Sequence, residues 1–385
     1  MKLENTISQV TRVWLEIFGM WPNSSCIFLR RIFWVVALIF EQVGQYQYII
    51  MHLYSTEISE LMNHLSAAMS FTLFCIKLVV FWYKQRTFKR LLVMMAIDWE
   101  KCFNEEVHIF ATTNNVKLSQ RFANMTVVLF SIAVILYSSN ILHTGTDKTS
   151  NASITQPLIL EMELPFHYNR RFVYELVIIA QFFHLWLCSC AIGLLNALLI
   201  NLILHVSGQI DILREWVMKI FSKEKGRGAS LFMIKKAIRK HQKIITFSEH
   251  IEDLYSNIAM ALFVSDTLII CCLGFIMVTS IGTSDAARII IRTVLFYFVI
   301  NMEAFIFCFA GEYLSAKSQS IGDAAYDTCW YDSYSTANRI IPFLIMRSQN
   351  QLTITIGKVT NLSLERFTNI IRVSASYVSV LLAMY

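Results

Sequence analysis

Long apolar stretches separated by short polar segments run along almost the whole chain, and this pattern predicts helices that cross a membrane. About 20 apolar residues are needed to cross the hydrocarbon core of a bilayer. Seven stretches approach or exceed that length, at residues 32–54, 58–83, 122–143, 172–204, 258–281, 289–314 and, more weakly, 363–385. The fourth stretch is too long for one crossing, so its helix is expected to project into the cytoplasm as far as Phe221.

The positions of the basic residues predict the orientation, because cytoplasmic loops carry an excess of Lys and Arg. With the N-terminus inside, 24 of the 33 Lys and Arg residues fall in cytoplasmic segments. Only five fall in outside loops, namely Lys148, Arg170, Arg171, Arg288 and Arg292. Seven crossings then place the C-terminus outside. The predicted fold class is an all-α polytopic membrane protein with a cytoplasmic N-terminus and an extracellular C-terminus.

Apolar residues at helical spacing also occur at 7–21, before the first predicted span. With Trp14 and Trp21 as anchors, this segment is expected to form a helix on the inner membrane surface. An ordinary amphipathic helix packed on protein is the alternative. The predicted organisation is a cytoplasmic segment at 1–31, six spans at 32–314, a cytoplasmic anchor region at 315–350 and a last helix at 351–385.

The last span differs from the others because it is rich in charged and hydroxyl side chains. Positions 365, 369, 372, 376 and 379 are polar and recur at steps of three and four residues, which places them on one face of a helix. Such groups are costly at membrane depth unless they face water. Several copies of this helix around a symmetry axis could line a pore, whereas a peripheral amphipathic helix is the alternative interpretation.

Composition supports a membrane protein and argues against an enzyme. Hydrophobic residues make up 56% of the chain and charged residues 16%, against about 25% charged in soluble domains. The histidines His64, His143 and His184 are scattered without evident partners, so no catalytic or metal constellation is predicted. Neither a cofactor nor a nucleic acid partner is expected. One N-glycosylation triplet, at Asn151, falls in a predicted outside loop.

A few ionisable residues occur inside the predicted spans. Lys77 is close to the cytoplasmic end of its span and is expected to extend its ammonium group to the interface. Glu175 is expected to do the same at the outer end. Glu41, Asp266 and Glu303 are deeper, and we expect each to face the helix bundle and to form structural hydrogen bonds.

Two parts of the chain carry a recognisable residue pattern. The first is Phe18-Gly19-Met20-Trp21-Pro22, before the first span. The second is longer and runs from the sixth span to the C-terminus, through Cys308–Ser315, Ser318, Ala325-Tyr326, Trp330-Tyr331, Arg347–Gln349, Leu352–Lys358, Leu362–Glu365, Phe367 and Ser376-Tyr377. Both parts resemble the insect odorant receptor family, and the first is similar to its Gly-x-Trp-Pro signature.

The resemblance implies an odorant-gated, non-selective cation channel of four seven-helix subunits in the plasma membrane of olfactory sensory neurons. Co-receptors in this family have a long cytoplasmic insertion between helices four and five that is short here. The chain therefore resembles a tuning subunit, which assembles with the shared co-receptor. In the family the last helix lines the pore, and the residues that match its pore-facing and gate positions are Ser376, Ser379, Val380 and Met384.

The family binds small volatile ligands between helices two, three, four and six, in the outer half of the membrane. The orientation gives the ends of the helices that face outward. The candidate ligand-binding residues there are Leu65, Met69, Leu136, Tyr137, Asn140, Tyr174, Ile178, Phe182, Tyr297 and Phe298. Aromatic rings would supply contact area, and the tyrosine hydroxyl groups would supply direction.

Two other receptor classes are alternatives to an odorant receptor. A G-protein-coupled receptor is disfavoured because its N-terminus is outside and because no Asp-Arg-Tyr or Asn-Pro-x-x-Tyr motif occurs. A gustatory-type ligand-gated channel shares the topology, but the Thr-Tyr…Gln-Phe pattern of its last helix is missing. The gustatory-type channel is kept as the main alternative.

Overall fold

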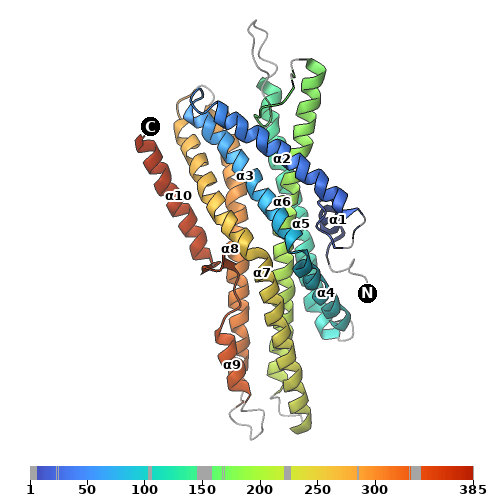
Figure 1. Cartoon of the computed structure of the whole chain (residues 1–385). Coiled ribbons are helices and arrows are strands. Elements are labelled where there is room, and N and C mark those ends of the chain that lie inside the picture. Colours follow the sequence, from blue (N-terminus) through green and yellow to red (C-terminus); the bar gives the residue numbers. More distant parts are fainter. Residues whose placement is uncertain are drawn as a thin grey trace.

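The computed structural model is an elongated bundle of helices (Figure 1). It describes residues 7–22, 24, 26–102, 106–144, 158–166, 168, 170–220, 227–283, 286–328, 330 and 340–384. Its elements are α1 (Gln9–Ile17), α2 (Ile27–Met51), α3 (Ile58–Tyr83), α4 (Gln85–Cys102), α5 (Glu106–Thr144), α6 (Arg171–Ile220), α7 (Arg227–Thr279), α8 (Ala286–Tyr326), α9 (Ile341–Gln349), β1 (Thr355–Ile356), β2 (Thr360–Asn361) and α10 (Leu364–Met384). Asn151, the predicted glycosylation site, lies outside the described residues.

Six helices in the described part of the chain are long and apolar enough to cross a membrane, namely α3, α5, α6, α7, α8 and α10. The first predicted span forms α2, which has 25 residues and is therefore about 37 Å long. Its second half carries Glu41, Gln42, Gln45 and Gln47, which lower its hydropathy relative to the six. The assignment of α2 as the seventh membrane-crossing helix is therefore supported by its length and by its packing beside α3. Because α2 begins at Ile27, the predicted boundary at residue 31 falls inside this helix.

The helices α6 and α7 extend far beyond the thickness of a bilayer. They contain 50 and 53 residues, which corresponds to about 75–80 Å against a hydrocarbon core of about 30 Å. The predicted extension of the fourth span is confirmed, since α6 ends at Ile220. The predicted limits of α5, α7 and α8 are too short, because amphipathic turns continue these helices past the apolar stretch. The lower half of the bundle in Figure 1 is formed by the extensions of these long helices together with α4 and α9.

The N-terminal helix α1 packs on the bundle with one face. Phe18 and Trp21 are buried, and the Phe18 ring stacks on Trp34 with 4.1 Å between centroids. Trp21 is therefore a core residue and not the interfacial anchor that we expected, because its ring is covered by protein. The opposite face exposes Val10 and Val13, so contact of that face with lipid stays a prediction.

A short hairpin fixes the start of α10. The turn between β1 and β2 has Gly357 and Lys358 at φ of +57° and +63°, as in a type I′ hairpin turn. The Gly357 N–H donates to the Ser256 carbonyl of α7 over 3.0 Å. On the other side, Gly311 of α8 lies directly against the Leu362 backbone, and a Cβ atom at Gly311 would be 2.7 Å from the Leu362 carbonyl oxygen.

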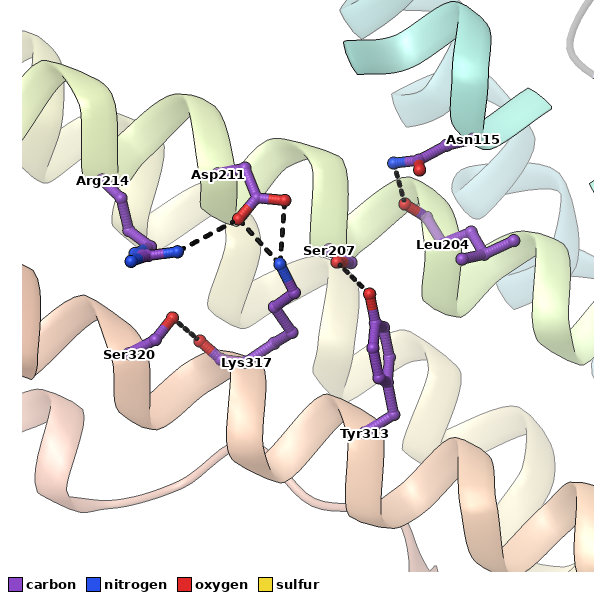
Figure 2. A network of polar contacts seen from close by, with 8 residues as sticks. All are labelled: Asn115, Leu204, Ser207, Asp211, Arg214, Tyr313, Lys317 and Ser320. Atoms are coloured by element: carbon purple, nitrogen blue, oxygen red, sulfur yellow. Dashed lines mark hydrogen bonds and ion pairs between the residues drawn. The ribbon is translucent and has the colours of Figure 1, made fainter. Parts of the chain in front are cut away.

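Polar contacts tie α6 to α8 beyond the apolar part of the bundle. Figure 2 shows the Lys317 ammonium beside both Asp211 carboxylate oxygens, at 2.9 and 3.0 Å, with Arg214 approaching the same carboxylate. One turn away, the Ser207 and Tyr313 hydroxyl groups are 3.1 Å apart. The Asn115 amide of α5 donates to the Leu204 carbonyl over 3.2 Å. These contacts fix the relative position of α5, α6 and α8.

Candidate functional site

A cavity of about 120 Å³ lies among α3, α5, α6 and α8. Its wall is formed mainly by aliphatic and aromatic side chains. The lining residues are Ala67, Ser70, Phe71, Leu73, Phe74, Lys77, Phe130, Ala133, Val134, Tyr137, Leu160, Leu185, Cys188, Ser189, Ile192, Arg292, Leu295, Phe296, Val299, Ile300 and Glu303. An apolar cavity with a few polar groups is the usual form of a small-molecule site.

The four helices that line this cavity are the second, third, fourth and sixth spans, which are the helices named for ligand binding from the sequence. Among the ten predicted ligand-binding residues, Tyr137 lines it. On α6 the lining begins at Leu185, beyond the predicted positions 174–182. On α8 it reaches Glu303, beyond the predicted 297 and 298. The cavity thus extends deeper into the membrane than the sequence indicated.

The other predicted ligand-binding residues lie around the cavity without lining it. Leu136 and Phe298 are exposed on the outside of the bundle. Six are half-buried, namely Leu65, Met69, Tyr174, Ile178, Phe182 and Tyr297, and all of these except Leu65 pack against the core. The side chain of Asn140 lies outside the described part. A ligand role for these residues stays a prediction, which would require a ligand that reaches beyond the cavity.

An ion pair buried in the membrane region forms the deep end of the cavity. The Lys77 ammonium of α3 contacts the Glu303 carboxylate of α8. The two residues are 1% and 3% exposed, so Lys77 does not extend to the interface. The expectation that it would do so was wrong because α7 and α8 cover it and provide acidic partners. Lys77 also lies 5.7 Å from the centroid of the Phe307 ring.

A second acidic side chain lies close to this ion pair. Asp266 of α7 is fully buried, and it interacts electrostatically with Lys77. Neither of its carboxylate oxygens has a hydrogen-bond partner among the described residues. The cluster Lys77–Asp266–Glu303 therefore joins α3, α7 and α8 through one ammonium and two carboxylates, as expected for deep charges that face the bundle.

A separate polar contact joins α2 to α6 beside the cavity. His184 contacts the Glu41 carboxylate through Nε2, and the Gln45 amide donates to Glu41 over 3.1 Å. His184 also stacks on Phe71 with 6.1 Å between ring centroids. The interpretation of His184 as a histidine without a partner was wrong, because Glu41 is 143 positions away in the chain and only the fold brings it near.

The helix α10 contacts α7 immediately beside the buried cluster. The Ser374 hydroxyl donates to the carbonyl of Thr267, the residue after Asp266, over 3.2 Å. One turn further along α10, Val378 approaches Gly274 of α7, and a Cβ atom at Gly274 would be 2.8 Å from Val378 Cγ2. The chain of contacts thus leads from the cavity through α7 to α10.

The predicted pore face of α10 points away from the rest of the chain. The predicted pore and gate residues Ser376, Ser379, Val380 and Met384 are all exposed, with Val380 at 56% and Met384 at 81%. In contrast, Ile370 and Ser374 are buried against the bundle. One face of α10 therefore holds it to its own chain. The polar stripe, at positions 365, 369, 372, 376 and 379, is exposed except for Asn369, which is half-buried.

A charged cluster lies outside the membrane-crossing part, at α4. The Asp98 carboxylate contacts Lys243 Nζ at 2.6 Å and His205 Nε2 at 3.5 Å. Burial alone would raise the pKa of Asp98. The contact with His205, the charge of Lys240 and the hydrogen bond from Lys243 together outweigh burial and lower this pKa to about 2. Asp98 is therefore an ionised link that holds α4 against α6 and α7.

Sequence comparison places this bundle among known receptors. The family model described as "7tm Odorant receptor" matches residues 57–375. Because that match covers most of the chain, this protein belongs to the odorant receptor family. It is a multi-pass membrane receptor and not an enzyme.

Individual relatives come from flies and mosquitoes. Odorant receptor 67c of Drosophila melanogaster is 29% identical over 148 residues, which are 38% of this chain and 35% of that protein. Odorant receptor Or2 of Anopheles gambiae is 30% identical over 152 residues, or 40% of this chain and 39% of that protein. The match therefore spans well under half the length of these relatives.

The fold is also similar to that of a solved receptor. The olfactory receptor OR5 of Machilis hrabei in complex with eugenol superposes with a TM-score of 0.78 at 17% identity, covering 98% of this chain and 97% of that one. A second structure of the same receptor gives a TM-score of 0.73 at 18% identity. The likeness extends over almost the whole of both chains, whereas the sequence matches above are partial.

Proposed function

We propose that this chain is the odorant-binding subunit of a ligand-gated, non-selective cation channel in the plasma membrane of olfactory sensory neurons. A small volatile molecule would bind in the cavity among α3, α5, α6 and α8. The position of this cavity is the observation that supports the proposal. Its deep end, formed by Lys77 and Glu303, lies against α7, and α7 contacts α10. The complex of OR5 with eugenol supports a small aromatic ligand for a receptor of this fold.

The subunit arrangement is part of the proposal. The polar stripe of α10 is exposed in the single chain, and such a stripe is favourable where it faces water. Four such helices around an axis would enclose an aqueous pore, with Val380 and Met384 forming a hydrophobic constriction. This chain would supply some of the four helices and the shared co-receptor the others.

Current recording tests this function directly. Cells that express the chain together with the co-receptor should show odorant-evoked cation current in excised membrane patches without nucleotides. Cells that express the co-receptor alone should not respond to the same odorants. A current that disappears with nucleotide depletion would contradict the channel function and favour a G-protein-coupled receptor. A response to non-volatile tastants alone would favour the gustatory-type channel.

A further inference from the structure

One charged residue of the cavity wall has no acidic partner in the described structure. Arg292, counted with the outside basic residues and placed near the start of the predicted span 289–314, lies in α8, six residues after the helix begins at Ala286. It is half-buried and lines the cavity. Its guanidinium carbon is 5.5 Å from the centroid of the Tyr137 ring, so the cation rests on an aromatic face within the site.

The other cation of the cavity differs from Arg292 in this respect. Lys77 is matched by Glu303 and Asp266, whereas Arg292 has no hydrogen-bond acceptor or ion-pair partner among the described residues beyond the Tyr137 ring. A guanidinium group carries five N–H donors in one plane. The cavity therefore offers directed donors at the Arg292 end, and the group that satisfies them has to be an acceptor.

The rest of the wall defines the body of the ligand. Phe130, Val134 and Ile192 are among the apolar side chains between the Arg292 end and the Lys77 end. The volume of about 120 Å³ is similar to that of an engineered apolar cavity of about 150 Å³ that holds benzene in another protein. A single ring or a short hydrocarbon chain matches this space.

Charge balance distinguishes a neutral acceptor from an anionic one. Arg292 and Glu303 are 11 positions apart on α8, or about 16 Å along the helix. The deep end already holds two acidic side chains, Glu303 and Asp266, against the one ammonium of Lys77. A carboxylate ligand would bring another acidic group into the same cavity and would have to leave water, which is costly. A neutral carbonyl oxygen accepts from Arg292 without either penalty.

We propose that the cavity selects small neutral carbonyl compounds, such as ketones, aldehydes or esters, whose oxygen accepts a hydrogen bond from Arg292. The hydrocarbon part then extends toward Phe130, Val134 and Ile192. The proposal rests on the function proposed above. It adds a chemical class for the ligand and a residue that determines specificity.

Pairs of isosteric ligands test this selectivity. Acetophenone and α-methylstyrene differ by a carbonyl oxygen in place of a methylene group, and 2-heptanone and 2-methyl-1-heptene form a second pair. Hydrogen bonds to charged groups contribute enough to change affinity about ten- to a hundredfold. Each carbonyl compound should therefore open the channel at about ten- to a hundredfold lower concentration than its alkene.

Three variants connect the preference to Arg292. Arg292→Met should abolish the difference in half-activating concentration between each ketone and its matched alkene. Arg292→Lys, which keeps a cationic donor, should retain part of the preference even if the methionine variant folds poorly. Arg288→Met is the matched control, because Arg288 lies one turn earlier on α8, is exposed and does not line the cavity.

The outcomes separate this inference from the proposed function. Equal responses to ketone and alkene in the unmodified receptor would overturn the carbonyl preference, while the evoked current would still support an odorant-gated channel. A preference that persists in Arg292→Met would overturn the role of Arg292. Stronger responses to benzoate than to acetophenone would show that the site takes anions. No current with a broad odorant panel would contradict the proposed function itself.

Discussion

Replacement of Lys77 by methionine is expected to destabilise the folded chain by about 3–5 kcal/mol, because removal of one partner leaves buried charge without compensation. Methionine fills a similar volume but leaves the acidic side chains of Glu303 and Asp266 in an apolar environment without a cation. Heat denaturation of the detergent-solubilised receptor, followed by fluorescence-detected gel filtration, measures the effect as a lower midpoint temperature and less monodisperse protein at each temperature.

Two further variants separate the charge effect from the change of side chain. Lys317→Met removes a lysine from the same helix bundle, but that lysine and its partner Asp211 are 26% and 37% exposed. An exposed pair contributes at most about 1 kcal/mol, so this variant should be close to the unmodified receptor. Lys77→Met combined with Asp266→Asn and Glu303→Gln removes the whole cluster and should recover most of the lost stability. Equal losses for Lys77→Met and Lys317→Met would show that the carboxylates do not depend on Lys77.

A single methyl group at Gly311 is expected to displace the start of α10. Alanine there would place Cβ 2.5 Å from Leu362 Cβ and 2.7 Å from the Leu362 carbonyl oxygen. The backbone at Leu362 is held by its N–H, which donates to the Ile354 carbonyl over 2.8 Å, so it cannot move aside freely. Overpacking of this kind typically costs about 1–3 kcal/mol. Hydrogen exchange at the amides of α10 should become faster.

Gly208→Ala is the matched control for Gly311→Ala. A Cβ atom at Gly208 would meet only the Asn115 side-chain amide, at 3.0 Å, and a side-chain end can move. This variant should keep slow exchange in α10 and lose less stability than Gly311→Ala. If the two alanine variants are equally stable and exchange alike in α10, the close approach of α8 to the hairpin does not position this helix.

The long apolar spans could be predicted from the sequence because hydropathy alone specifies them. The limits 58–83 of the second span agree with α3, and the projection of the fourth span agrees with α6. The extensions of α7 and α8 could not be found by hydropathy, because their inner turns are amphipathic and resemble soluble helices. Their apolar faces are covered by α4, α6 and α9, and those contacts exist only in the folded chain.

The site could be predicted to the level of the helices but not of the individual side chains. Helical periodicity does not fix the rotation of a fully apolar helix, since every face is compatible with burial. The predicted ligand-binding set therefore contained both Tyr137, which lines the cavity, and its neighbour Leu136, which lies on the exposed side of the helix. Lys77, Glu303 and Asp266 were visible as charges in spans, yet their contact depends on the packing of three helices far apart in sequence.

We propose that odorant binding in the cavity among α3, α5, α6 and α8 opens the channel, and one pair of adjacent substitutions tests this coupling. Ala133 lines the cavity, whereas its neighbour Ile132 is 50% exposed on the outside of α5. We predict that Ala133→Phe, recorded with the co-receptor at matched surface expression, raises the half-activating odorant concentration at least about tenfold. A phenylalanine ring occupies most of the space that a small ligand would need. Ile132→Phe should leave this concentration unchanged. Unaltered odorant-evoked current in Ala133→Phe, or the same loss in both variants, would contradict the account.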